Sequence, residues 1–176
     1  MITSTKLKII FLDFDGVLDT AFYDSYLEQH NMPSCDESGR PIFDPVCIGY
    51  LKQIVETTNA QIVVSSDWKY YDSLEDLRKM WESRQMSGNL FDVTPNLKIS
   101  RGAEICGWIN GKANISNYVI IDDLGFENFN EDQLDYLVTV NPLYGIDDVI
   151  CQRAIEILNY YCPLNFKDSK NVWLER

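Results

Sequence analysis

The chain has 176 residues, of which 45% are hydrophobic and 24% charged, and its net charge is −12. A chain of this length can bury one substantial core, so we expect a single domain over residues 1–176, with a core at about 7–160 and a C-terminal tail at 162–176. The acidic charge argues against sequence-independent binding along nucleic acid, which needs a basic surface, but leaves room for a small basic patch at a cleft.

The sequence carries no sign of a membrane or secreted protein. No apolar stretch approaches the ~20 residues of a spanning helix, and the first apolar run is cut short by Asp13, unlike a secretory signal. We therefore expect a cytoplasmic protein with no membrane contact and no stable protein partner. The cysteines are odd in number and without a CxxC pair, so we expect free thiols rather than a zinc site or disulfides at Cys35, Cys47, Cys106, Cys151 and Cys162.

Four apolar runs alternate with helical patterns, at residues 7–12, 61–64, 118–121 and 137–140. This alternation predicts a doubly wound α/β fold, a parallel sheet with helices on both faces. The polar segment 19–43 predicts a loop or small flap over the end of the first strand. The remaining connections already hold helices, so no large cap domain fits.

Helix starts are marked by residues that cap helices through their side chains. The segment before Leu97 is rich in Gly, Asn and Pro and predicts a loop. The predicted caps are Asp44, Ser73, Ser100 and Asp147.

Polar side chains follow three of the predicted strands. Because the carboxyl ends of parallel strands open on one edge of a sheet, we expect these groups to share a cleft. Carboxylates there could hold Mg²⁺, and hydroxyl and backbone N–H groups could hold phosphate oxygens. Each group alone could be only a turn or a helix cap, but together they indicate metal-assisted catalysis. The groups are Asp13 and Asp15, then Ser65, Ser66 and Asp67, then Asp122 and Asp123.

These motifs resemble those of the haloacid dehalogenase (HAD) superfamily of phosphohydrolases. Residues 12–18, Leu-Asp-Phe-Asp-Gly-Val-Leu, look like its first motif, residues 63–65 like its second and residues 119–123 like its fourth. Residues 62–69, 94–95, 101–109 and 140–146 are similar to the HAD domain of Swiss Army Knife RNA repair proteins, a resemblance that spans roughly residues 7–160. The sequence departs from that pattern at Asp67 and Lys69, which leaves the phosphate-holding loop more acidic.

The resemblance implies a HAD-like, Rossmann-type fold, capless or with only a small flap, and Asp13 on the central strand. It implies a Mg²⁺-dependent phosphomonoesterase that forms an aspartyl-phosphate on Asp13. Asp15 would protonate the leaving oxygen and then deprotonate water. Asp13, the backbone carbonyl of Asp15, and the Asp122–Asp123 pair would hold the metal, with Asp122 direct or through water.

The resemblance also implies a set of phosphate-binding groups. Ser65 would hydrogen-bond the phosphoryl group, with Ser66 beside it, and Gly16 would let the backbone approach closely. A cation must offset the charge near the nucleophile. Arg101 is our first choice because it opens a helix before the third predicted strand. Lys69, next to the phosphate loop, and Lys98 are the alternatives.

A site without a large cap would admit a nucleic-acid end, a nucleotide or a phosphoprotein. RNA repair is the role suggested by the resemblance, and a small-molecule phosphatase such as a nucleotidase is the alternative within enzymes. A non-catalytic module that binds Mg²⁺ and phosphate is the alternative outside them. The presence of both Asp13 and Asp15 argues against that module.

Overall fold

The structure, a computed structural model, describes residues 6–110, 112 and 114–160. In this part of the chain the strands form one all-parallel sheet in the order β3-β2-β1-β4-β5. The central strand is β1, whose residues Ile9 to Leu12 are fully buried, and the predicted α/β fold is confirmed. The strands are β1 (Leu7–Leu12), β2 (Gln61–Val64), β3 (Leu90–Val93), β4 (Ile115–Asp122) and β5 (Leu137–Thr139).

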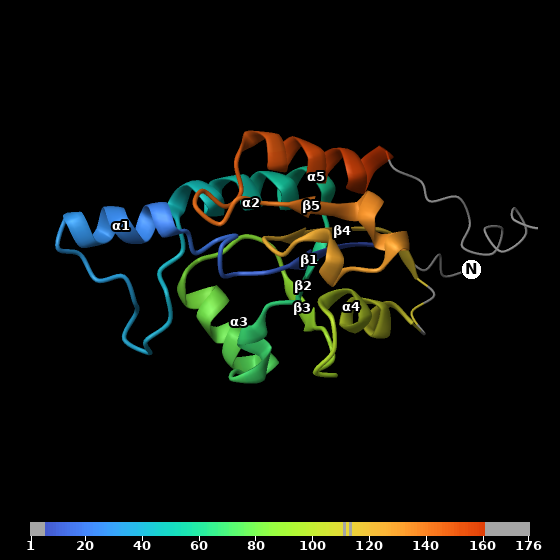
Figure 1. Cartoon of the computed structure of the whole chain (residues 1–176), viewed down its shortest axis with the longest axis horizontal. Helices are drawn as coiled ribbons and strands as arrows, with labels where there is room; N and C mark the ends of the chain where they lie inside the picture. The colour runs from blue at the N-terminus through green and yellow to red at the C-terminus, as the bar shows by residue number, and fades with distance from the viewer. Residues whose placement is uncertain (1–5, 111, 113, 161–176) are drawn as a thin grey trace, which may run out of the picture.

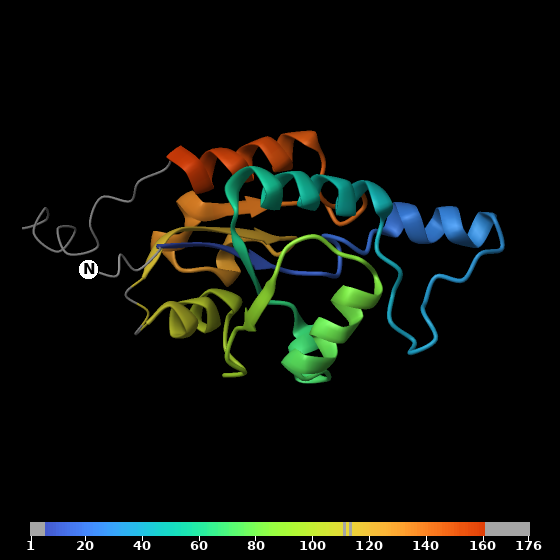
Figure 2. The ribbon, with the colours of Figure 1, turned by 180° about the vertical axis from the view of Figure 1, so that it is seen from behind.

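Helices cover both faces of the sheet (Figures 1 and 2). Helices α2 (Pro45–Thr58) and α5 (Asp148–Tyr160) lie on one face, and α3 (Leu74–Ser83) and α4 (Arg101–Ile109) lie on the other. Short 3₁₀ helices complete the connections: η1 (Asp67–Tyr70), η2 (Phe126–Asn128) and η3 (Glu131–Tyr136). No helix within the described residues is long and apolar enough to cross a membrane.

The predicted helix caps are all present. Each of the four side chains accepts a hydrogen bond from a backbone N–H in the first turn of its helix, which satisfies a donor that has no partner inside the helix. The bonds run to Asp44 from Val46 (2.8 Å), to Ser73 from Asp76 (3.2 Å), to Ser100 from Ala103 (3.3 Å) and to Asp147 from Ile150 (2.9 Å).

The flap predicted over residues 19–43 contains a helix that the sequence did not reveal. Helix α1 (Ala21–Gln29) extends beyond the carboxyl ends of the strands (Figure 1). It buries only Leu27, so it has no apolar stripe that periodicity could detect. The chain returns to α2 through a segment held by two ion pairs, Arg40–Asp72 and Arg84–Asp36, both at 2.7 Å.

Two strands also differ from the prediction. Strand β3 lies in the segment predicted to be a loop. It is a short edge strand with only Leu90 buried, and Asp92 interrupts its apolar residues after two positions, so it does not read as an apolar run. Strand β4 begins at Ile115 rather than at Tyr118; the polar residues Ser116 and Asn117 separate Ile115 from the apolar run and hide this start in the sequence. The tail at 162–176 and Cys162 lie outside the described residues, and the four described cysteines are free thiols.

Candidate active site

Hydrogen bonds between neighbouring strands bring three strand ends to one level. The N–H of Ser65 donates to the carbonyl of Leu12 at 3.0 Å, and the N–H of Asp13 donates to the carbonyl of Ile121 at 3.1 Å. Asp13 at the end of the central strand therefore lies beside Ser65 on one side and Asp122 on the other. The register of the sheet, set by buried apolar strands, positions this site.

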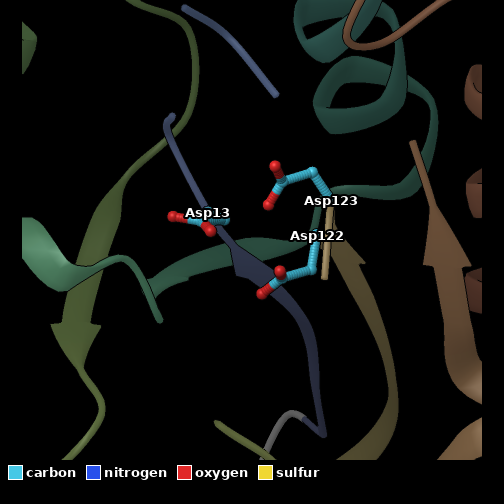
Figure 3. A group of neighbouring side chains, drawn as sticks. All are labelled: Asp13, Asp122 and Asp123. Atoms are coloured by element: carbon cyan, nitrogen blue, oxygen red, sulfur yellow. The ribbon is translucent and has the colours of Figure 1, made fainter. Parts of the chain in front are cut away.

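Three carboxylates converge at this edge. One oxygen from each of Asp13, Asp122 and Asp123 lies within 4.8 Å of the others, and Figure 3 shows the side chains grouped at the ends of β1 and β4. Burial raises the pKa of Asp122 and of Asp123, and the charge of Asp13 raises both further. Three hard oxygen donors in so small a space fit the needs of a cation such as Mg²⁺.

Arg101, in the first turn of α4, lies against this cluster. Its Nη1 is 3.1 Å from Asp13 Oδ2 and 2.9 Å from Asp122 Oδ2, and its Nη2 is 3.2 Å from Asp67 Oδ1. The arginine is 9% exposed. Burial opposes its charge, but the three carboxylates outweigh burial and raise the pKa of Arg101. Asp122 also accepts from the N–H of Leu124 at 3.0 Å, so both of its oxygens already have partners.

Asp15 lies on the outer side of the cluster and is exposed. Its carboxylate accepts from the indole Nε1–H of Trp68, at 2.9 Å to one oxygen and 3.1 Å to the other. Partial burial raises the pKa of Asp15; the Trp68 hydrogen bond opposes this rise, and the charges of Asp13 and Asp67 add to it. A carboxyl with a raised pKa at the edge of such a cluster is suited to proton transfer.

The hydroxyl of Ser65 is fully buried and has no hydrogen-bond partner in the described part of the chain. Buried polar groups are nearly always paired, so this Oγ is free to meet an oxygen in the cleft. Ser66 differs, since its Oγ accepts from the N–H of Trp68 at 3.4 Å and caps η1. Gly16 has φ +71°, and a Cβ there would lie 2.6 Å from Asp123 Oδ2, so only glycine fits this turn beside the acids.

Lys69 points away from the acid cluster. Its ammonium donates to the carbonyl of Ser65 (3.1 Å), to Thr94 Oγ1 (2.9 Å) and to Glu104 Oε2 (2.6 Å), which uses all three of its N–H groups. Its side chain is only 2% exposed. These contacts favour a role for Lys69 in holding the loop after β2. The third candidate cation, Lys98, is exposed, and its backbone N–H donates to Glu104.

Three partners of the site were not selected from the sequence. Asp67 pairs with Arg101, Trp68 donates to Asp15, and Glu104 anchors Lys69. The sequence places Asp67 among the polar groups after the second predicted strand and Lys69 among the candidate cations, but it does not predict these pairings. The sequence held no signal for the role of Glu104, because only the fold shows that this acid is buried beside Lys69.

The architecture and the site together define the class of protein. A central parallel strand that ends in Asp-x-Asp, a hydroxyl after the next strand and an acid pair after the strand on the other side form a HAD-type α/β domain. The family described as "HAD domain in Swiss Army Knife RNA repair proteins" matches residues 9–149, and the chain belongs to this family. No curated protein and no solved structure matches the chain. Membership indicates a hydrolase of the phosphatase type, acting on a phosphorylated substrate.

Proposed function

We propose that this protein is a Mg²⁺-dependent phosphomonoesterase that works through an aspartyl-phosphate on Asp13. The observation that carries the proposal is the convergence at one sheet edge of Asp13, the Asp122–Asp123 pair, Arg101 and the unpartnered hydroxyl of Ser65. These groups provide a nucleophile, ligands for a cation and donors for phosphate oxygens in one place.

The donor set fits Mg²⁺, which prefers oxygen ligands. Asp13 and Asp123 would hold it, with the backbone carbonyl of Asp15. Asp122 would contribute less directly, because its two oxygens are engaged by Arg101 and by the N–H of Leu124. When bound, the ion would neutralise carboxylate charge and draw charge from the phosphoryl oxygens.

The side chains divide the reaction into two displacements. In the first, a carboxylate oxygen of Asp13 bonds to phosphorus while the bond from phosphorus to the leaving oxygen breaks, and Asp15 gives its proton to that oxygen. In the second, Asp15 takes a proton from water as the water oxygen attacks phosphorus and the bond to Asp13 breaks. The Phe14 N–H, which donates to Asp13 Oδ1 at 2.8 Å, keeps the nucleophile oriented.

Arg101 and Ser65 would stabilise the charge on the transferring group. Both are buried before substrate arrives, so little reorganisation is needed when charge develops. The guanidinium would exchange part of its contact with Asp13 for a charge-assisted bond to a phosphoryl oxygen. Gly16 would keep the mouth of the cleft clear of a side chain beside Asp123.

The substrate would be a nucleic-acid or nucleotide phosphate end, with a small-molecule phosphatase such as a nucleotidase as the alternative. The name of the matching family points to RNA repair. The only cover we find among the described residues is α1 and the segment that returns from it, which leaves space for a bulky leaving group. The net charge of −12 disfavours contacts along a long nucleic-acid tract.

The test is phosphate release from mononucleotides, phosphorylated oligonucleotides and phosphopeptides, with Mg²⁺, with Ca²⁺ and with chelator. We expect turnover with Mg²⁺, weak turnover with Ca²⁺ and none with chelator. Asp13→Asn should abolish turnover, and Asp15→Asn should slow both displacements. The control is Asp148→Asn, at an exposed position in α5. Wild-type rates in Asp13→Asn would refute the nucleophile, and release from no substrate would favour a non-catalytic module.

A further inference from the structure

A pocket of about 390 Å³ opens beside Asp15, within the usual size range of sites for small ligands. One wall is the segment that returns from α1, and the opposite wall is η1 with the two residues after it. Trp68, which donates to Asp15, belongs to the η1 wall. The residues that line the pocket are Asp15, Ser38, Gly39, Arg40, Pro41, Asp67, Trp68, Tyr71 and Asp72.

The position of the pocket assigns it to the leaving group, an inference that rests on the proposed function. A general acid must be within hydrogen-bond reach of the oxygen that it protonates. If Asp15 is that acid, the leaving oxygen points toward Asp15, and the rest of the leaving group extends from there. The pocket is the space that begins at Asp15 and leads away from the acid cluster.

The charges on the walls select against anions. Three carboxylates line the pocket, and Arg40 is its one cation among the described residues. Arg40 is already engaged by Asp72, with Nε 3.2 Å and Nη2 2.7 Å from the two carboxylate oxygens. Asp67 is 63% exposed and pairs with Arg101 through one oxygen. When Asp15 carries the proton to be donated, Asp67 and Asp72 still outnumber Arg40.

The surfaces that line the pocket favour a flat group. Tyr71 is 88% exposed, so its ring faces are open to a ligand at the pocket rim. Pro41 and Trp68 supply further apolar surface on the two walls. Aromatic rings stack on such surfaces with little loss of side-chain entropy.

We propose that this pocket binds a flat, aromatic leaving group that is neutral or cationic, and that it disfavours a leaving group with a second anionic charge. The Arg40–Asp72 pair sets this preference by keeping the guanidinium occupied. A nucleoside fits the description, because its base is planar and it carries no second phosphate. Of the two proposed substrates, the pocket therefore favours a nucleotide over a nucleic-acid end.

Three aryl phosphates of similar reactivity test the charge preference: tyramine phosphate, phenyl phosphate and 4-carboxyphenyl phosphate. We expect kcat/KM to fall along this series, by about tenfold between the ammonium and the carboxylate ester. Asp72→Asn frees Arg40 and should reduce or invert the preference, whereas Arg40→Gln removes the cation and should strengthen it. If the two substitutions merely loosened the wall, they would not shift the ratio of kcat/KM for the ammonium ester to kcat/KM for the carboxylate ester in opposite directions. Asp148→Asn is the control for a distant charge.

Tyr71→Ala tests the stacking surface. It should lower kcat/KM for phenyl phosphate relative to cyclohexyl phosphate by about fivefold or more, whereas Tyr160→Ala, at a position 81% exposed on α5, should leave the ratio unchanged. Comparing each ratio with the wild-type ratio cancels the different acidities of the two alcohols.

Binding of the free products gives a readout that does not depend on turnover. Tyramine should shift the indole N–H signal of Trp68 in an NMR titration, and 4-hydroxybenzoate at the same concentration should not. Turnover with equal kcat/KM across the charge series would overturn the pocket assignment and leave the phosphatase in place. If no ester is hydrolysed, the proposed function fails and with it the assignment to a leaving group. The titration then decides only whether the pocket binds a neutral or cationic aromatic ligand: a tyramine shift supports this binding, and no shift refutes it.

Discussion

Replacing Arg101 by methionine should destabilise the fold strongly at neutral pH in the absence of metal. Methionine keeps much of the apolar stem but removes the charge that lies 3.1 Å from Asp13 and 2.9 Å from the fully buried Asp122. Removing one partner of a buried ion pair costs about 3–5 kcal/mol, because the remaining charge is left uncompensated. The pair with Asp67, which is 63% exposed, adds less than about 1 kcal/mol. The expected loss is therefore about 3–5 kcal/mol, a large part of the stability of a typical domain.

Urea unfolding at pH 7 and pH 5, each with chelator and with Mg²⁺, measures this loss. Burial already raises the pKa of Asp122 in the wild type, and loss of Arg101 should raise it further. A raised carboxyl pKa means that stability is gained as the pH falls through the folded-state pKa, so the variant should recover part of the loss at pH 5. Mg²⁺ should also stabilise the variant more than the wild type. Arg153→Met, in an exposed ion pair on α5, should change stability by under about 0.5 kcal/mol. A variant as stable as the wild type at pH 7 in chelator, or equally destabilised at both pH values, would refute the reasoning.

Three further outcomes are expected. Ser65→Ala should leave the urea midpoint unchanged, since the Ser65 Oγ has no partner among the described residues. The same variant should lower kcat/KM by about ten- to a hundredfold. A loss of activity that is accompanied by a matching loss of stability would contradict a phosphate contact. Lys69→Met should cost about 3–5 kcal/mol of stability, because it leaves the buried carboxylate of Glu104 without its cation. It should lower kcat/KM less than Arg101→Met does; the reverse order would make Lys69 the phosphate cation. Burial raises the pKa of Asp19 to about 6 from 3.8, so the stability of the wild type should fall as the pH rises from about 4 to above 6. At pH 7, Asp19→Asn should be more stable than the wild type by about 1 kcal/mol, a value discounted for the partial exposure of Asp19. Melting curves at pH 4 should show no such gain.

The sequence predicted most of what positions the site, because buried strands and helix caps are local signals. The apolar run before Asp13 and the run before Asp122 gave two strands, and their parallel pairing placed both acids at one edge. Capping side chains gave the helix starts within a residue, since each cap satisfies a specific backbone donor. Arg101 was preferred from its place at the start of a helix, and that helix does direct it toward Asp13.

The missed elements lack a clear apolar pattern, although α1 does have a capping side chain, Thr20, which accepts from the N–H of Tyr23 at 3.1 Å. Strand β3 is short and lies at the sheet edge, and Asp92 inside it accepts from the indole of Trp108 at 2.7 Å; an acid in a strand becomes tolerable only through this tertiary contact. Helix α1 buries a single side chain, so neither periodicity nor composition marks it. The pairing of Trp68 with Asp15 spans 53 positions in sequence, and no local pattern encodes it.

The two buried cations show why spacing alone could not decide which of them lies beside Asp13. Lys69 follows the serines after β2, and Arg101 opens α4, so either could reach the same cleft. The structure separates them through the first turn of α4, where Arg101 faces the acids and Glu104 faces Lys69. Glu104 also accepts from the backbone N–H groups of Leu97 and Lys98. Because Lys69 in turn donates to the carbonyl of Ser65, one helical turn fixes both the cation beside Asp13 and the loop that carries the serine hydroxyl, and the distance between these two groups follows from a single rigid element.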